Sequence, residues 1–186
     1  MSRRFLTPTL QLVGQPEPGE ARAPPTLEAA YREHAGYLAS LALRVLGRDD
    51  EVDDVVHDVF LGAARTLNSV RDPGAVRAWL GTFTLRVARK KLRRRRLWSF
   101  LGLDVAPSYE DALIAPGADA ETKALLGQIY GMLDGLPASQ RIAWALRHIE
   151  GEPLADVARL CQCSLATAKR WIASAQVVID EACSDE

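Results

Sequence analysis

The sequence predicts an all-α protein built from two small helical domains that are joined by an acidic, flexible linker. Apolar residues recur at spacings of three and four along most of the chain, and no segment sustains the alternation typical of a strand. Charge also divides the chain, since residues 26–100 hold 14 Lys/Arg against 9 Asp/Glu, whereas residues 101–140 hold one Lys against 6 acids. The expected order is a disordered leader at 1–25, a first domain at 26–100, a linker at 101–120 and a second domain at 121–183.

The first domain should open with two amphipathic helices. Thr26 follows two prolines and is a typical N-cap, and the apolar stripe after it ends at Gly47. A second helix should begin at Asp49 or Asp50, bury a run of valines and present several acids on its other face. These acids fit either a solvated face near a helix N-terminus or a docking surface for a basic partner.

A long basic helix should follow. It is expected to begin after the Asp72–Pro73 cap and to extend to about Leu97. Eight Lys/Arg side chains lie within eleven residues from Arg86 to Arg96, which is more than the helix dipole can account for. Phosphates are the obvious counter-charges for such a run. Trp98 and Phe100 come next and are expected in the core, although they could stack on a base.

The second domain should contain four helices, of which the last two form a helix-turn-helix. The four are expected to begin near Asp119, Pro137, Pro153 and Ser164. The third is short and is separated from the last by a tight turn at residues 161–163, which is the spacing of this motif. Side chains in the first two turns of the last helix would then face a DNA major groove.

Composition excludes several classes of protein. A formal net charge of −1 excludes a globally basic binder, and no apolar run approaches the ~20 residues that cross a bilayer. Three cysteines form no disulfide framework, so we expect a cytoplasmic chain with reduced thiols. The three histidines are scattered and Cys161-Gln-Cys163 lacks the second pair of a zinc site, so we expect no metal, no cofactor and no enzymatic activity.

Four motifs, taken in order, resemble the extracytoplasmic-function (group IV) sigma factors of bacterial RNA polymerase. They are Asp53-Asp-Val-Val-His-Asp-Val-Phe60, Trp79-Leu80 with the later Leu92-Arg-Arg-Arg-Arg96, the segment from Leu133 to Arg147, and Cys163-Ser-Leu-Ala-Thr-Ala-Lys169. The resemblance covers about residues 27–100 as sigma region 2 and 122–182 as sigma region 4. It implies a factor that binds core polymerase, recognises the −10 and −35 promoter elements and directs transcription initiation and its regulation.

The resemblance also implies three sets of site residues. The set for core polymerase is Asp53, Asp54, His57, Asp58 and Phe60. The set for the −10 strand is Asn68, Arg71, Arg86, Arg89, Lys90, Arg93 and Arg94. The set for the −35 element is Arg141, Arg147, Ser164, Thr167, Lys169 and Arg170. The implied partners are the β′ clamp helices and β flap of core RNA polymerase, promoter DNA and, left open, an anti-sigma factor.

The chain departs from the family pattern at three positions. Arg86 and Lys90 replace the usual Asn and Asp, which makes the −10 face unusually basic, and Gln162 replaces a turn glycine. Two alternatives remain from the residues alone. One is a stand-alone helix-turn-helix regulator with an N-terminal sensor or dimer module, and the other is an RNA-binding protein that uses the arginine run.

Overall fold

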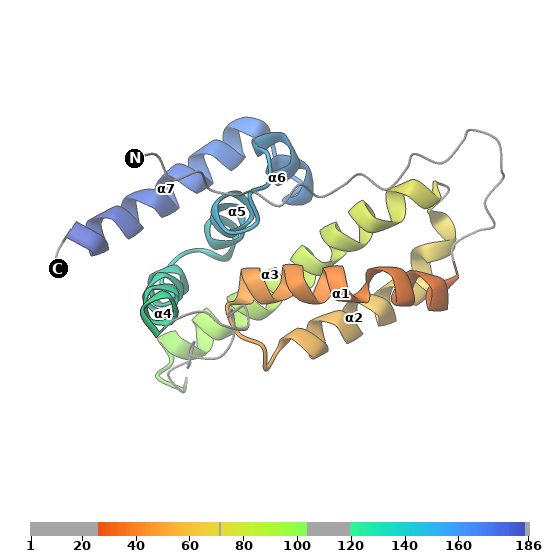
Figure 1. Cartoon of the computed structure of the whole chain (residues 1–186), viewed down its shortest axis with the longest axis horizontal. Coiled ribbons are helices and arrows are strands. Elements are labelled where there is room, and N and C mark those ends of the chain that lie inside the picture. Colours follow the sequence, from red (N-terminus) through yellow and green to blue (C-terminus); the bar gives the residue numbers. More distant parts are fainter. Residues whose placement is uncertain (1–25, 71, 104–119, 185–186) are drawn as a thin grey trace, which may run out of the picture.

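A computed structural model describes residues 26–70, 72–103 and 120–184, and it confirms the all-α prediction. In these ranges the chain forms helices and 3-10 turns and no strand, and none of the helices is both long and apolar enough to span a bilayer. The elements in order are α1 Leu27–Leu46, α2 Val52–Thr66, η1 Leu67–Ser69, η2 Pro73–Ala75, α3 Val76–Phe100, α4 Ala120–Asp134, α5 Ala138–His148, α6 Leu154–Leu160 and α7 Leu165–Ser184 (Figure 1). The predicted leader, most of the predicted linker and Arg71 lie outside the described residues.

Helix α1 has the predicted ends, whereas α2 begins later than expected. Thr26 Oγ1 accepts a hydrogen bond from the backbone N–H of Ala29 at 3.2 Å, and Gly47 ends α1 with a φ of 70°. Asp50 does not cap α2, because Arg48 binds its carboxylate across the turn and lowers the pKa of that carboxyl. The helix therefore starts at Val52.

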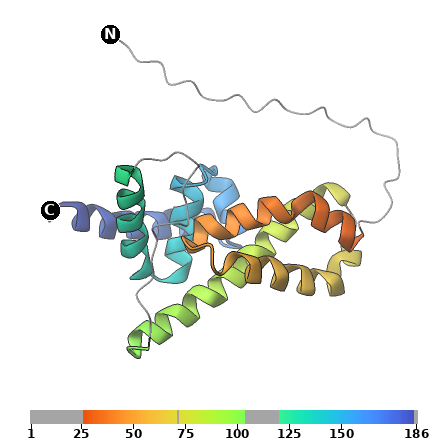
Figure 2. The ribbon, with the colours of Figure 1, turned by 60° about the horizontal axis from the view of Figure 1, so that its bottom comes forward.

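Helix α3 is the longest element and ends beyond the expected residue. Asp72 accepts a hydrogen bond from the backbone of Gly74 at 2.8 Å, and a 3-10 turn leads into the helix. Its 25 residues span roughly 37 Å. The helix continues past Leu97 to Phe100, so its last turn extends away from the rest of the bundle (Figure 2).

The second half contains the predicted helix-turn-helix. Ser164 Oγ accepts a hydrogen bond from the backbone of Thr167 at 3.1 Å and so caps α7. Gln162 turns the chain between α6 and α7 with a φ of 54°, as its place at the family's glycine implied. The predicted cap and turn therefore position the last helix as expected.

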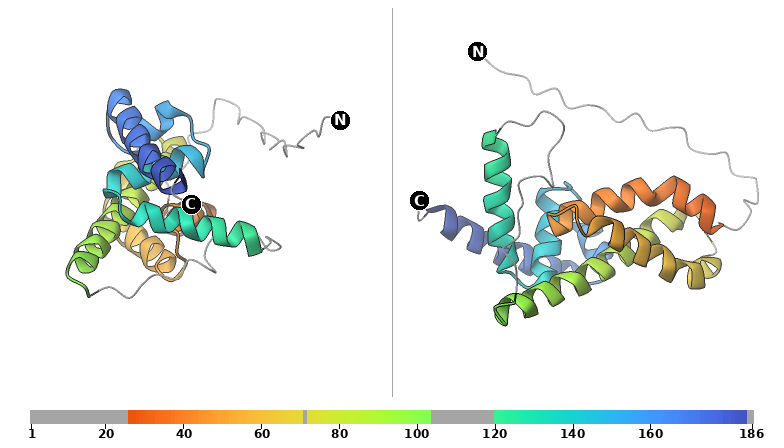
Figure 3. Two further views of the ribbon diagram at one scale, coloured as in Figure 1. Left: turned by 90° about the vertical axis from the view of Figure 1, so that its left-hand side faces the viewer. Right: turned by 90° about the horizontal axis from the view of Figure 1, so that it is seen from below.

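The two halves pack against each other. Helices α5 and α6 lie against α1 and α3, and one hydrophobic cluster joins side chains of both halves. Figure 3 shows this contact from two further sides, with α4 lying across α7 at the far end. A second, smaller cluster lies within the second half, around Tyr130, Leu133, Trp144 and Ile179. The predicted domain limits remain a prediction, but the halves share a core.

Candidate functional site

The acidic candidates occupy the solvent-facing side of α2. Asp53, Asp54, His57 and Asp58 are all exposed, and the valines of the helix are buried opposite them. A groove of about 350 Å³ separates this face from α3 and is lined by acids of α2 and by Lys90, Lys91 and Arg94. Asp54 forms an ion pair with Lys91 across it at 3.0 Å. The face therefore offers acids to a partner and is framed by cations.

Phe60 lies on the buried side of α2. Its side chain is 7% exposed and contacts the ring of Tyr31, whose centroid is 4.8 Å away. Tyr31 is 54% exposed, so it presents an aromatic surface beside the acids that rests on Phe60. Sequence reasoning missed Tyr31, since a tyrosine at a helical spacing from other apolar residues is typical of a core position.

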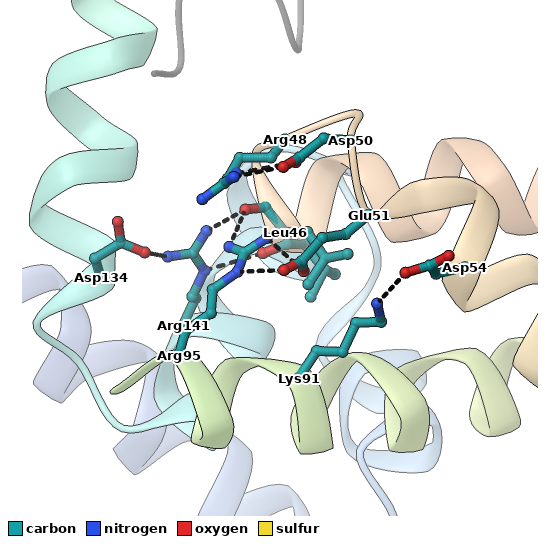
Figure 4. Close-up of polar contacts among 10 residues, drawn as sticks. Leu46, Arg48, Asp50, Glu51, Asp54, Lys91, Arg95, Asp134 and Arg141 are labelled. Carbon is teal, nitrogen blue, oxygen red and sulfur yellow. Dashed lines mark hydrogen bonds and ion pairs between the residues drawn. The ribbon is translucent and has the colours of Figure 1, made fainter. Parts of the chain in front are cut away.

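The arginine run of α3 divides between the protein's interior and its surface. Arg95 is paired with Glu51 at 2.6 Å and donates to the backbone carbonyl of Leu46 at 3.1 Å (Figure 4). Lys91 pairs with Asp54, so both side chains hold α3 against the turn and helix before it. These two cations have partners within the chain and were not among the candidates for DNA.

The −10 candidates on α3 have two different surroundings. Lys90, Arg93 and Arg94 are exposed. Arg89 is half-buried and donates to the carbonyl of Cys161, and Arg86 donates to the side chain of Gln162, both at 3.4 Å. The last two therefore point to the turn of the helix-turn-helix. Of the two candidates before α3, Asn68 belongs to η1 and Arg71 lies outside the described residues.

The expectation that Trp98 and Phe100 are core residues is wrong. Trp98 is 43% exposed and Phe100 is 87% exposed. Because α3 continues past the helices that cover it, its last turn has no neighbour to bury these rings. The guanidinium of Arg94 lies 5.4 Å from the centre of the Trp98 ring, a cation–π contact that holds the indole beside the exposed arginines.

The −35 candidates on α7 form an exposed polar face. Lys169 and Arg170 are exposed near the start of the helix. Ser164 and Thr167 bond to each other at 2.9 Å, so part of their hydrogen-bonding capacity is taken by the cap. Arg147 is also exposed and donates to the carbonyl of Glu152 at 3.2 Å.

Arg141 is not on the surface where the sequence prediction puts it. Its side chain is 1% exposed, and it donates to the backbone carbonyls of Val45 at 3.0 Å and Leu46 at 2.6 Å. Asp134 accepts a further bond from the same guanidinium (Figure 4). The carbonyls at the end of α1 have no partner within their own helix, so a guanidinium from the other half satisfies them.

Neighbouring groups complete this buried contact. The hydroxyl of Tyr130 donates to the carbonyl of Arg44 at 2.7 Å, and the side chain of Arg44 pairs with Glu150. No sequence signal identifies these partners, because each lies 86 or more positions from its mate.

The titratable groups of the described residues give no catalytic arrangement. Burial raises the pKa of the Cys161 thiol to about 12 and also raises that of Cys163, so both thiols are poor nucleophiles at neutral pH. His148 stacks on Trp144, and burial lowers its pKa. Within these ranges, no group of three His, Cys, Asp or Glu side chains could hold a metal ion.

Comparisons with known proteins agree with this arrangement in two blocks. The model of sigma-70 region 2 matches residues 30–97, and the model of sigma-70 region 4 matches residues 126–175. The first block holds the acidic and arginine-rich helices, and the second holds the helix-turn-helix. The match over 30–97 excludes an unrelated sensor module in the first half.

Curated relatives cover most of the chain. The ferric citrate uptake sigma factor FecI of Escherichia coli K12 is 30% identical over 81% of this chain and 86% of its own length. The sigma-H factor of RNA polymerase from Pseudomonas aeruginosa is 27% identical over 92% of each chain.

Solved structures are similar in fold. CnrH, in complex with the cytosolic domain of CnrY, matches 86% of this chain with a TM-score of 0.56 at 21% identity. The sigma factor RpoE of Bartonella quintana, in complex with the anti-sigma factor NepR, matches 83% with a TM-score of 0.60 at 22% identity.

Proposed function

Because the chain belongs to the extracytoplasmic-function sigma factors of the sigma-70 family, and so binds core RNA polymerase and directs transcription initiation at promoters, we propose a role for each of its charged surfaces. The acids of α2 dock on the β′ clamp helices. Their exposure on one face, with the valines of α2 buried opposite, supports this role. The docking set is Asp53, Asp54, His57 and Asp58, with Phe60 supporting the exposed ring of Tyr31.

The exposed cations of α3 hold the −10 strand. A cationic surface beside an exposed aromatic ring fits single-stranded DNA, which offers phosphates and unstacked bases. Lys90, Arg93 and Arg94 lie on this surface, and Arg94 adjoins the Trp98 ring. Asn68, Arg71, Arg86 and Arg89 complete the proposed set, with the first two holding a flipped base.

The start of α7 reads the −35 element, while arginines of α5 contact phosphates. Lys169 and Arg170 are exposed within the first two turns, where a recognition helix meets base edges. Ser164 and Thr167 can reach a phosphate or a base edge from the cap. Arg147 and Arg141 are the proposed phosphate contacts, the latter only once it has left its buried site. The β flap of the polymerase is the proposed partner of this half.

The remaining proposals concern the chain as a whole. The acidic linker occupies the basic channel of the polymerase where nascent RNA would otherwise lie, and catalysis belongs to the polymerase alone. Since polymerase and promoters are cytoplasmic, the chain acts in the cytoplasm. Two proteins of similar fold were solved with inhibitory or regulatory partners, one of them named an anti-sigma factor, and we propose a partner of this kind here.

A promoter library tests the proposed reading face. Holoenzyme reconstituted from core polymerase and this chain should start transcription from a defined subset of randomised promoters. Arg170→Ala should relax one −35 position by about 1–3 kcal/mol of discrimination, as loss of a base contact does. Arg32→Ala, an exposed arginine of α1, is the control and should leave the preference unchanged. An unaltered −35 preference in Arg170→Ala would remove this residue from the reading face.

A further inference from the structure

We propose that the free chain inhibits itself through a closed contact in which α4 and α5 bind the carbonyl end of α1. This inference rests on the proposed DNA-binding roles of Arg86, Arg89 and Arg141, and it assigns the closed contact to this chain alone, without a partner. We define the closed contact by the backbone oxygens of Arg44, Val45 and Leu46 on one side and the side chains of Tyr130 and Arg141 on the other (Figure 4).

The chemistry of the contact explains why it is stable. The last carbonyls of a helix carry its negative dipole end and lack partners within the helix. Arg141 brings a full positive charge to them with short hydrogen bonds, and Asp134 neutralises the far side of the guanidinium. Because Arg141 is 1% exposed, separation of the halves would expose to water a charge and carbonyls that now satisfy each other.

The packing at Gly47 shows how closely the halves approach each other. A Cβ atom on this glycine would lie 2.2 Å from a ring carbon of Tyr130, so only a glycine fits under the tyrosine. At the other end of the contact, the side chain of Leu160 lies against Gly81 of α3. The first half and the second half therefore meet along α1 and α3.

Closure has a direct cost for DNA binding. Arg141 cannot reach a phosphate while it holds the end of α1. Arg89 and Arg86 donate to Cys161 and Gln162, so the turn of the helix-turn-helix lies on part of the −10 face. Each half thus covers DNA-binding side chains of the other, and the chain must open before both promoter elements can be bound.

The ion pair between Arg44 and Glu150 allows opening to be controlled without touching the proposed DNA-binding or polymerase-binding residues. It joins α1 to the turn after α5, and its side chains are 40% and 13% exposed. Charge reversal at either residue places like charges together across the closed contact, while exchange of both restores an attractive pair. Arg32→Glu is the matched control, since it makes the same charge change on the exposed side of α1.

The first measurement uses the free chain without polymerase. Fluorophores at Ala64→Cys on α2 and at Cys183 on α7, in a chain with Cys161→Ala and Cys163→Ser, report the distance between the halves by energy transfer. Arg44→Glu and Glu150→Arg should lower the transfer efficiency, and the double exchange and Arg32→Glu should match the parent. Tyr130→Phe, which removes one donor and no charge, should lower it to a smaller extent.

The second measurement uses chains with natural cysteines and core polymerase. If closure is inhibitory, Arg44→Glu and Glu150→Arg should each accelerate holoenzyme assembly roughly three- to tenfold, as expected when an ion pair worth about 1 kcal/mol becomes repulsive. The double exchange should return to within about twofold of the parent.

The outcomes separate this inference from the proposed function. Equal transfer efficiency in all variants, or opening without faster assembly, would overturn self-inhibition while holoenzyme formation still supports a sigma factor. Failure of the double exchange to restore closure would show that the pair does not hold the halves together, and so would also overturn it. Failure of every chain to assemble with polymerase would instead reject the proposed function, whatever the fluorescence shows.

Discussion

Gln162 illustrates how one residue can carry a cost that the fold tolerates. Its φ of 54° is in the left-handed region, where a side chain with a Cβ is disfavoured by roughly 1–2 kcal/mol relative to glycine. The turn requires this conformation, because α6 and α7 must meet at the angle of a helix-turn-helix. The side chain gains only a long contact with Arg86 at 3.4 Å.

Gln162→Gly should therefore stabilise the protein. Relief of the left-handed strain outweighs the greater flexibility of glycine in the unfolded chain, so we expect a gain of about 0.5–1 kcal/mol and a melting temperature about 2–4 °C higher. Thermal unfolding followed by circular dichroism measures it. Gln162→Ala is the control, since it removes the contact with Arg86 but keeps the strain, and it should not stabilise. A melting temperature below that of the parent in the glycine variant would contradict the argument.

The acids of α2 should matter for binding and little for stability. Asp54→Arg combined with Asp58→Arg reverses two exposed charges, so the affinity for core polymerase should fall about a hundredfold or more. The pair of Asp54 with Lys91 is exposed on the carboxylate side, so the free energy of unfolding should change by less than about 1 kcal/mol. Pull-down with core polymerase and urea unfolding give the two values.

A matched charge reversal tests whether position or net charge is responsible. Glu33→Arg with Glu28→Arg makes the same change in net charge on exposed positions of α1 and should leave polymerase affinity within about twofold. Wild-type affinity in the α2 double variant would remove these acids from the docking surface.

At the scale of whole helices, local signals predicted most of the structure. Thr26, Gly47 and Ser164 set helix ends through their own backbone geometry, which sequence patterns carry directly. The errors arose where a side chain found a distant partner or none. Asp50 bound Arg48 rather than capping α2, and Trp98 lies on a turn that no other described helix covers.

Helix α3 should separate stability from DNA binding between two arginines of one run. Arg95 pairs with Glu51 and Leu46 in a half-buried site, so Arg95→Ala should cost about 2 kcal/mol of unfolding free energy. Arg93 is exposed, so Arg93→Ala should change stability by less than about 0.5 kcal/mol. In the holoenzyme, Arg93→Ala should instead weaken binding to all promoters alike and reduce the salt slope by about one unit.

The two readouts serve as controls for each other. Urea unfolding of the free chains and promoter binding at two salt concentrations are measured for both variants. Equal destabilisation by the two substitutions would contradict the division of the run into interior and surface cations.

At the scale of the whole molecule, the contact between the halves could not be predicted from the sequence. Helical periodicity tells which face of α1 or α5 is buried but not which helix covers it. Arg141 matched a family motif, and nothing in its neighbourhood in the sequence indicates that it binds carbonyls 95 and 96 positions away. The family resemblance correctly predicted what the protein does, whereas the positions of its arginines depend on how the halves meet.

Two glycines of α1 should respond to the same substitution with opposite signs, because only one lies where the halves meet. Gly36 is exposed within the helix and a Cβ there would touch nothing within 4 Å, so Gly36→Ala should stabilise by about 0.5–1 kcal/mol through helix propensity. Gly47 has a φ of 70° and lies under the ring of Tyr130, so Gly47→Ala combines left-handed strain with an overlap in the core. We expect a loss of about 2–4 kcal/mol.

A double variant distinguishes the two causes of the loss at Gly47. If the overlap with Tyr130 contributes, Tyr130→Ala should cost less in the Gly47→Ala background than in the parent chain, because the ring is already displaced there. If only backbone strain contributes, the two losses should add. Urea unfolding of the four chains gives the coupling. Strict additivity would show that the ring adjusts without cost, and it would contradict the tight packing of Tyr130 against the end of α1 that joins the first half to the second.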